Sequence, residues 1–496
     1  MPPLSFLDIP RELRDFIYED YLTIDGGYYF NFKTGKLEPA KPGQQPLNLA
    51  LTCSLIATEI KGLALTHNVI TFSTTAGVRR HDAKRYASMM FSVNSTATAA
   101  LWRLRKAITS DMRQDVAAQF PMFSPTLDKL VVMEEDDYDN DYWTYGIQKM
   151  SGLIPSLYYE ALHYIVQLLR RQCMDPKISG LDIGCKPWGI PSEAQLDYMA
   201  DALCSTLKDE CCASLPIVWY DEIVPPWNGW EYYHLNPGDR SRYNYSAAAA
   251  AFFFLKSKPE LLVHMRKLVL DEDRPSSLKP TLQGKGLIPF CEENPHLRIE
   301  RRVRLWTNVL VSDDRPCAPA QRLEYALEGN PPWDAGSPAH YIAPAVWEWI
   351  EESLALPPNF SMVFDGNPLP ELSAEIFRDV IVRDAVMQVA QQECIVRGLT
   401  PSPSWVEEPQ RPPFNGYPQA IQDIANGSSN ITCNFETCGF GELEVEETIL
   451  KCSDFSYTQW DNERYNRPKT HYASAPPLPD WLELLKQLDI ADESEE

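Results

Sequence analysis

The 496-residue sequence has no apolar run that approaches the roughly 20 residues needed by a membrane-spanning helix. The longest uninterrupted run, Ala247–Leu255, has nine residues, and its alanines and phenylalanines predict a buried helix instead. The first ten residues also lack a basic segment followed by an apolar one, so no secretion signal is indicated. We therefore expect a cytoplasmic or nuclear protein with no membrane partner.

Basic residues are also scarce, since 45 Lys and Arg stand against 69 Asp and Glu, which gives a formal net charge of -24. A field of this sign repels phosphate backbones, so we expect no nucleic-acid partner. The densest basic cluster lies within residues 298–304, and its spacing is more typical of a solvated or salt-bridged face. Its members are Arg298, Arg301, Arg302 and Arg304.

Metal-binding patterns are incomplete. Cys433 and Cys438 have no second close pair of cysteines, so we interpret them as unrelated thiols rather than zinc ligands. The acidic segment 134–141 matches the first ligand positions of a calcium loop, but Tyr142 and Gln148 stand where such a loop needs Gly and Glu. We expect no metal and no cofactor.

Local catalytic motifs are missing as well. Ser276 and Lys279 have the spacing of a Ser-x-x-Lys pair, but prolines on both sides predict a loop. The eight histidines include no His-x-x-x-His pair, and Gly284–Gly286 is too short to cradle a phosphate. The sequence therefore favours a protein that is not an enzyme.

The N-terminal segment, by contrast, is clearly patterned. Pro10 suits a first helical turn, and the apolar residues that follow it share one helical face: Leu13, Phe16, Ile17 and Tyr21. Aromatic residues around Thr34-Gly35 then predict a hairpin of Tyr28–Phe32 with Lys36–Leu37. A helix over Leu47–Leu65 and a strand over Asn68–Ser73 complete the expected unit.

Residues 6–19 resemble the opening of fungal F-box-like domains, and residues 51–59 resemble their second helix. The resemblance covers about the first 75 residues. Residues 287–295 are in turn similar to segments of uncharacterised fungal proteins. The resemblance implies that the first helices contact a ubiquitin-ligase adaptor while the rest of the chain receives a protein target. The implied contact set is Leu7, Ile9, Pro10, Leu13 and Ile17. An alternative is that the same residues pack on the body.

The remaining chain predicts more helix than strand. Leu127–Asp136 and His264–Asp273 are similar apolar runs that end in acids, which indicates two strands of a shared sheet rather than a solenoid. Helices are expected at Pro155–Cys173, Glu193–Leu207, Ala343–Leu354 and Leu369–Arg397. Beyond Pro401 the composition turns proline-rich and polar, with a short helix near Trp481 before an acidic end.

We therefore expect a helix-rich α+β fold with three parts: an F-box-like unit at residues 1–75, a mixed body at 76–400, and a partly extended acidic tail at 401–496. The favoured function is a protein-interaction or adaptor role, and the resemblance implies that of a substrate-recognition subunit of a ubiquitin ligase. Two alternatives stay open: a structural interaction protein without ligase binding, and an enzyme whose site gathers around the aromatic stretch 219–234.

Overall fold

The computed structural model describes most of the chain in eight stretches. These are residues 6–41, 46–75, 100–133, 155–173, 245–274, 280–309, 339–400 and 416–456. Positions 90, 93–94, 97–98, 186, 188–190, 192, 194–195, 197–198, 276, 459–460 and 463 are described as well. The expected helix-rich α+β class is confirmed. In the described stretches, no helix combines the length and apolar character required to cross a bilayer.

One seven-stranded sheet runs through the molecule in the order β2-β1-β3-β4-β5-β6-β7. Only β1 and β2 pair antiparallel, as the predicted hairpin, and every other neighbouring pair is parallel. The strands are β1 (Tyr28–Asn31), β2 (Lys36–Pro39), β3 (Val69–Ser73), β4 (Lys267–Glu272), β5 (Arg298–Arg304), β6 (Phe360–Asp365) and β7 (Ile431–Cys433). The predicted strands at β3 and β4 are confirmed.

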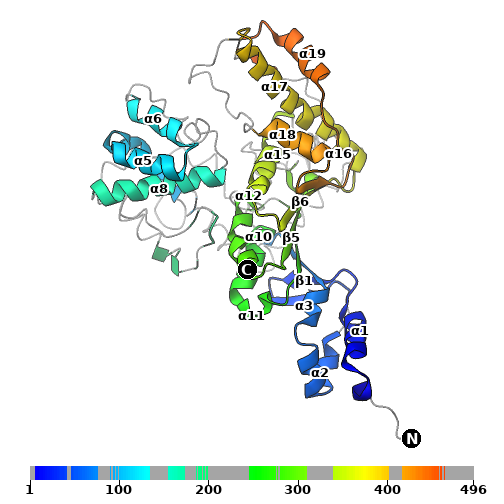
Figure 1. Cartoon of the computed structure of the whole chain (residues 1–496). Helices are drawn as coiled ribbons and strands as arrows, with labels where there is room; N and C mark the ends of the chain where they lie inside the picture. The colour runs from blue at the N-terminus through cyan, green and yellow to red at the C-terminus, as the bar shows by residue number, and fades with distance from the viewer. Residues whose placement is uncertain are drawn as a thin grey trace, which may run out of the picture.

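The parallel strands follow the chain order, which determines where the helices pack. Right-handed connections between successive parallel neighbours carry the intervening chain across the same face of a sheet. Ile70, Leu268 and Ile299 accordingly meet α10 (Ala247–Ser257) and α13 (Ile288–Glu293), as the predicted buried helix requires. Further along the same face, Val303 and Phe364 contact α15 (Ala339–Leu354). The sheet is thus packed on one face by these helices (Figure 1).

Short helical turns connect these elements. They are α11 (Pro259–Leu262), α12 (Pro280–Gln283), η9 (Gly284–Leu287) and the π-turn η10 (Leu305–Val309). In α11 and α13 a proline occupies the first turn, where its missing N–H leaves no helical hydrogen bond unmade.

The N-terminal unit contains η1 (Phe6–Asp8), α1 (Arg11–Leu22), η2 (Pro46–Leu51), α2 (Ser54–Glu59) and α3 (Leu63–His67). The single helix predicted over residues 47–65 is wrong, because the chain breaks it twice. The second break is at Gly62, whose φ of +80° lies in the left-handed region that favours glycine. The strands of this unit join the common sheet, so the boundary expected at residue 75 does not separate two cores.

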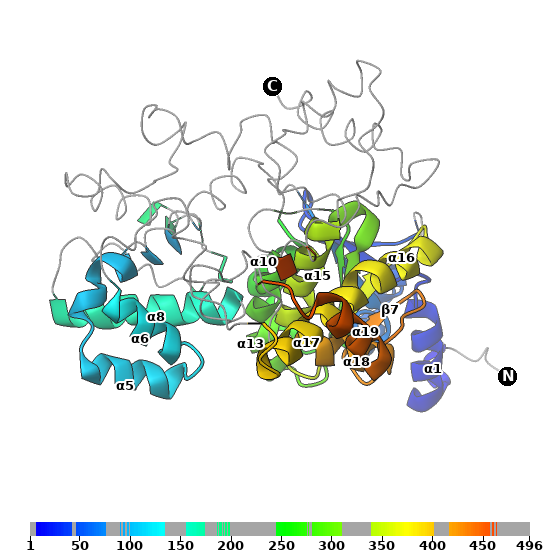
Figure 2. The ribbon, with the colours of Figure 1, turned by 90° about the horizontal axis from the view of Figure 1, so that it is seen from above.

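A helical lobe lies to one side of the sheet (Figure 2). It contains η3 (Arg105–Ala107), α5 (Ser110–Gln119), α6 (Ser124–Val132) and α8 (Pro155–Cys173), the last as predicted. The strand predicted from Leu127 is wrong, because the run forms α6 and buries Leu127 and Leu130 at helical spacing. Pro125 begins this helix, and a short apolar run alone does not distinguish strand from helix. The predicted helix over 193–207 lies mostly outside the described residues.

The C-terminal part is built into the body. The helix predicted over 369–397 forms as α16 (Pro370–Ile376), the π-turn η11 (Phe377–Val382) and α17 (Arg383–Val396). After residue 400, α18 (Tyr417–Ala425) packs on the sheet, β7 pairs with β6, and α19 (Glu442–Cys452) packs on α17. The body therefore does not end near Thr400 as expected. The helix predicted near Trp481 lies outside the described residues.

Candidate protein-binding site

Helix α1 buries Arg14 together with two core residues and leaves a second apolar side exposed. Its buried residues are Arg14, Tyr18 and Leu22, which recur every four positions. The apolar face predicted from the sequence is exposed, with Phe16 at 70% and Leu13 at 53% of full exposure. Ile17 and Tyr21 are exposed too. The predicted helix is confirmed, but its predicted apolar face is exposed and does not pack against the rest of the chain.

Arg14 links the buried side of α1 to helix α2. Its Nε donates to Glu59 Oε2 at 3.1 Å and its Nη2 donates to Oε1 at 2.5 Å, which ties α1 to α2 by a two-point ion pair. The Tyr18 hydroxyl donates to Glu59 Oε2 at 2.7 Å. These hydrogen bonds, from Arg14 first and Tyr18 second, lower the pKa of Glu59 to about 2. The buried Arg14 is tolerated because its charge is paired with that of Glu59.

The Arg14 guanidinium also holds the segment that precedes α1. Arg14 Nη1 donates to the carbonyl oxygens of Ile9, at 2.6 Å, and Leu7, at 3.2 Å. Leu7 and Pro10 are exposed and Ile9 is half-buried, so this segment lies over the end of the helix with its side chains accessible. The contact set implied by the resemblance therefore lies on one structural unit, at and just before α1. Phe16 and Tyr21, which that set left out, extend it.

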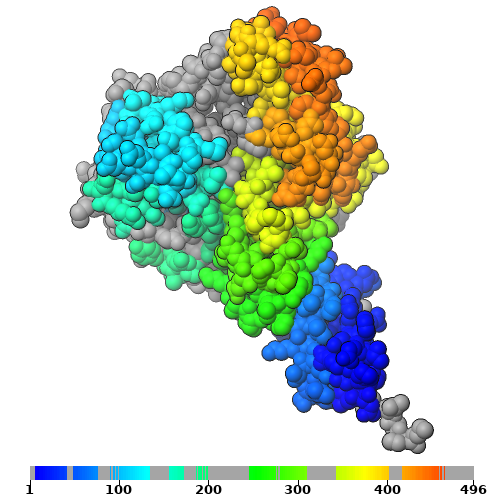
Figure 3. Space-filling view, in the orientation of Figure 1, coloured from blue at the N-terminus to red at the C-terminus, as the bar shows by residue number. Residues whose placement is uncertain are grey.

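Two further leucines are exposed on the neighbouring helices. Leu51 is the last residue of η2, and its side chain is 84% exposed. Leu55 lies in the first turn of α2 and is exposed, whereas the next residue, Ile56, is buried. We call the set Leu7, Leu13, Phe16, Ile17, Tyr21, Leu51 and Leu55 the N-terminal apolar face. Single exposed apolar residues are common on proteins, and the number of them on this small unit makes it the candidate interaction surface. The unit extends away from the rest of the described chain (Figure 3).

The segments of the body that carry candidate catalytic or metal-binding residues are only partly described. The aromatic stretch 219–234 and the acidic segment 134–141 lie outside the described residues, as does most of the Ser276–Lys279 loop. Among the residues that are described, no three His, Cys, Asp or Glu side chains are grouped to hold a metal. Cys433 is a half-buried thiol whose pKa is raised to about 12 by burial, which disfavours the thiolate that metals bind.

One polar cluster that the sequence did not reveal joins the helical lobe to the body. Lys285 Nζ of η9 donates to Ser156 Oγ at the start of α8, and the Ser156 backbone N–H donates to Glu352 of α15 at 2.8 Å. Burial lowers the pKa of Lys285. A serine beside such a lysine could act as a nucleophile. Ser156 is fully buried, however, so the cluster is placed to join the two parts rather than to meet a substrate.

No family model matches this chain, and neither the curated proteins nor the solved structures contain a match to it. We therefore infer the function from the chain's own surfaces. The N-terminal apolar face is the strongest of them.

Proposed function

We propose that this protein is an interaction or adaptor protein that docks through its N-terminal apolar face, as a substrate-recognition subunit of a ubiquitin ligase would. The observation that carries the proposal is the outward apolar side of α1, held in place by the inward pair of Arg14 and Glu59. A chain that only needed to fold would gain by burying Phe16 and Ile17. Their exposure is explained if a partner covers them.

The resemblance of residues 6–19 and 51–59 to F-box-like segments gives the partner's class. Those segments carry six of the seven residues of the N-terminal apolar face, and the resemblance implies that such helices bind the adaptor that links them to a cullin. The N-terminal unit would then connect the body, which receives a target, to the ligase. A structural interaction protein would use the same face for a different partner.

The test is recovery of the cullin-linked adaptor from a fungal extract by the purified full-length protein, compared with the variant Phe16→Gln plus Ile17→Gln. Glutamine is a good helix former, so α1 should be retained. Interface residues of this kind contribute about 1–2 kcal/mol each, so the double variant should bind at least about tenfold more weakly. The measured quantity is adaptor recovered per mole of protein.

A matched control is Leu443→Gln plus Leu450→Gln, two comparably exposed leucines on α19. This variant should recover the adaptor as well as the wild type does. Equal recovery by all three proteins would contradict docking through α1. A folded wild type that recovers no adaptor would remove the ligase role, and partners lost only with Phe16 and Ile17 would then favour the structural alternative.

A further inference from the structure

The face of the sheet opposite the packed helices is mostly polar. On β5 the residues that alternate with buried Ile299, Arg301 and Val303 are Arg298, Glu300, Arg302 and Arg304. Their neighbours in register on this face are Lys267, Val269 and Asp271 of β4, and Ser361, Val363 and Asp365 of β6. Val269, Asp271 and Asp365 are buried, whereas the side chains of Lys267, Arg302 and Arg304 are 43–48% exposed. A parallel strand buried on both faces would instead read as a continuous apolar run. We call the surface on which these three cations are exposed the open face.

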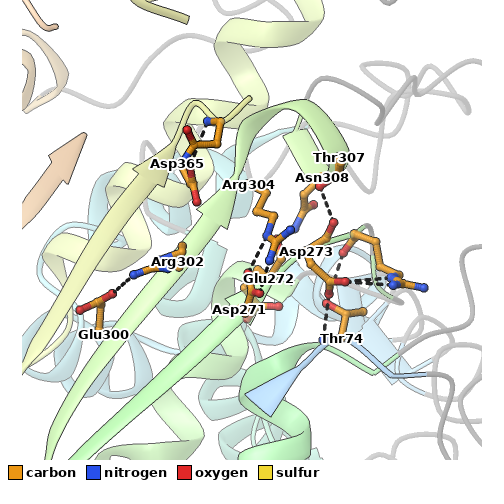
Figure 4. A network of polar contacts seen from close by, with 12 residues as sticks. Thr74, Asp271, Glu272, Asp273, Glu300, Arg302, Arg304, Thr307, Asn308 and Asp365 are labelled. Atoms are coloured by element: carbon orange, nitrogen blue, oxygen red, sulfur yellow. Dashed lines mark hydrogen bonds and ion pairs between the residues drawn. The ribbon is translucent and has the colours of Figure 1, made fainter. Parts of the chain in front are cut away.

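The charges on the open face are arranged in two levels. Arg302 is 43% exposed and donates from Nη2 to Glu300, which is 18% exposed, at 2.7 Å. Arg304 is 45% exposed and donates through Nε and Nη2 to Asp271, which is 11% exposed, at 2.9 and 2.5 Å. In both pairs the carboxylate is therefore the more buried partner and the cation the more exposed one, and Figure 4 shows the two pairs.

The sequence prediction that residues 298–304 form a salt-bridged face therefore holds for Arg302 and Arg304, and Lys267 adds a further pair with Glu300 at 3.0 Å. Arg301 is salt-bridged as well, to Glu272, but on the opposite, buried side, so it is not part of a solvated face. Because each cation is already fixed by a carboxylate, little side-chain entropy is left to lose on binding.

The fixed cations still have donors to offer. A guanidinium carries five N–H groups. Among the described contacts, Glu300 takes one of those on Arg302 and Asp271 takes two of those on Arg304. The other N–H groups are available to an acceptor approaching from solvent, and a carboxylate accepts a guanidinium fork at two points.

We propose that the open face binds an extended, acidic segment of a partner protein, with carboxylates at every second position. Arg302 and Arg304 are two residues apart on a strand, which separates them by about 6.6 Å along its axis. Alternate residues of an extended partner have the same spacing. This binding site is independent of the N-terminal apolar face.

A protein segment is favoured over a nucleic acid because of the total charge. At -24, the protein repels a long polyanion from every approach, and the carboxylates beneath the open face reduce its local positive charge. A short segment with a few carboxylates encounters less of this repulsion and can use individual guanidinium groups.

The proposal is tested by fluorescence anisotropy with the full-length protein and four labelled probes. They are a twelve-residue peptide of alternating Glu and Thr, its Gln-for-Glu counterpart, a peptide with the same six Glu in one block, and a twelve-nucleotide single-stranded DNA. The alternating acidic peptide should bind most tightly, and its binding should weaken as salt is raised. Equal binding of the Gln peptide, or tighter binding of the DNA, would overturn the proposal.

The variant Arg302→Gln plus Arg304→Gln should bind the alternating acidic peptide about tenfold more weakly than the wild type does. Arg378→Gln removes a similarly exposed, ion-paired arginine from η11 and should leave binding unchanged. Ser361→Glu adds a carboxylate to the open face without breaking a pair, so it should also weaken binding even if the double variant is unstable. Unchanged binding by Ser361→Glu, or no binding by the wild type at millimolar peptide, would refute the site.

Discussion

Arg301 and Glu272 form an ion pair inside the protein, with 2.8 Å between Nη2 and Oε1 and exposures of 1% and 0%. Arg301 also donates to the carbonyl of Thr281 at 2.9 Å and lies 4.4 Å from the ring centre of Trp349. The other oxygen of Glu272 accepts from the N–H of Ala247, at the start of α10. The pair thus links β4, β5 and the first helix on the packed side.

Arg301→Met should cost about 3–5 kcal/mol of unfolding free energy, because it leaves the buried charge of Glu272 unpaired. Arg302→Met is the control. It removes an exposed partner of Glu300 one residue away, and it should cost less than about 1 kcal/mol. Urea unfolding followed by tryptophan fluorescence measures both. Similar costs for the two variants would contradict the assignment of Arg301 to the interior.

The pair of Arg14 and Glu59 predicts a pH dependence of the N-terminal unit. The folded pKa of Glu59, about 2, lies below its ordinary value of 4.5, so folding favours the charged form. The stabilisation is therefore complete above about pH 4.5 and is lost as the pH falls through that value toward 2. Glu59→Gln should lack this contribution at every pH.

Hydrogen exchange of the α1 amides checks this prediction when wild type and Glu59→Gln are compared at the same pH. The variant should exchange faster at pH 7, and the difference should shrink near pH 2.5. Glu12→Gln, an exposed change in the first turn of α1, should show no such trend. A difference that does not vary with pH would argue against the ionised pair.

Two glycines in the left-handed region allow a matched comparison. A Cβ added at Gly62 would lie 2.2 Å from Nδ1 of His264, whereas at Gly35 nothing lies within 4 Å. Both have positive φ, so Gly35→Ala should cost about 1–2 kcal/mol from backbone strain alone. Gly62→Ala should cost about 1–3 kcal/mol more, because the added Cβ would displace the packed ring of His264.

Thermal unfolding of the two alanine variants measures that difference. Adding His264→Ala to Gly62→Ala should recover most of the extra loss, although His264→Ala alone gives no gain. If both glycine variants melt at the same temperature, the close approach of Gly62 to His264 is not present in solution.

A chain that stops at Thr400 should not fold. It would lose α18 and β7, which cover Phe364 and pair with β6, and Trp460, whose Nε1 donates to Thr400 Oγ1 at 3.2 Å. The exposed apolar surface should drive aggregation. Size-exclusion chromatography and a thermal melt would show this, and a monomeric fragment with a cooperative transition would restore the boundary expected from composition.

The sequence predicted the elements whose patterns are local. The hairpin at β1 and β2, the strands β3 and β4, and helices α1 and α8 were all evident from period and capping. The domain boundary predicted at residue 400 is wrong. Prolines and polar residues in the connecting segments resemble the composition of an extended tail, although α18 and β7 pack onto the sheet.

What could not be predicted depends on pairs far apart in the chain. Nothing near Arg14 shows that Glu59 will neutralise it, and without that partner the apolar side of α1 is the natural side to bury. Arg301 obscured the open face in the same way, since a charge at an inward position broke the alternation of Ile299 and Val303. In both cases the carboxylate that allows the arginine to be buried lies far away in the sequence.

The order of the sheet also bears on synthesis. A ribosome delivers about 5–20 residues each second, so the roughly 190 residues between Ser73 and Lys267 take about 10–40 s to emerge. During that interval β3 has no β4 beside it, and Ile70 and Phe72 have no α10 above them. The nascent chain therefore carries an unpaired, apolar strand edge long enough for a chaperone to bind it, and newly made chains should be the form most prone to aggregate.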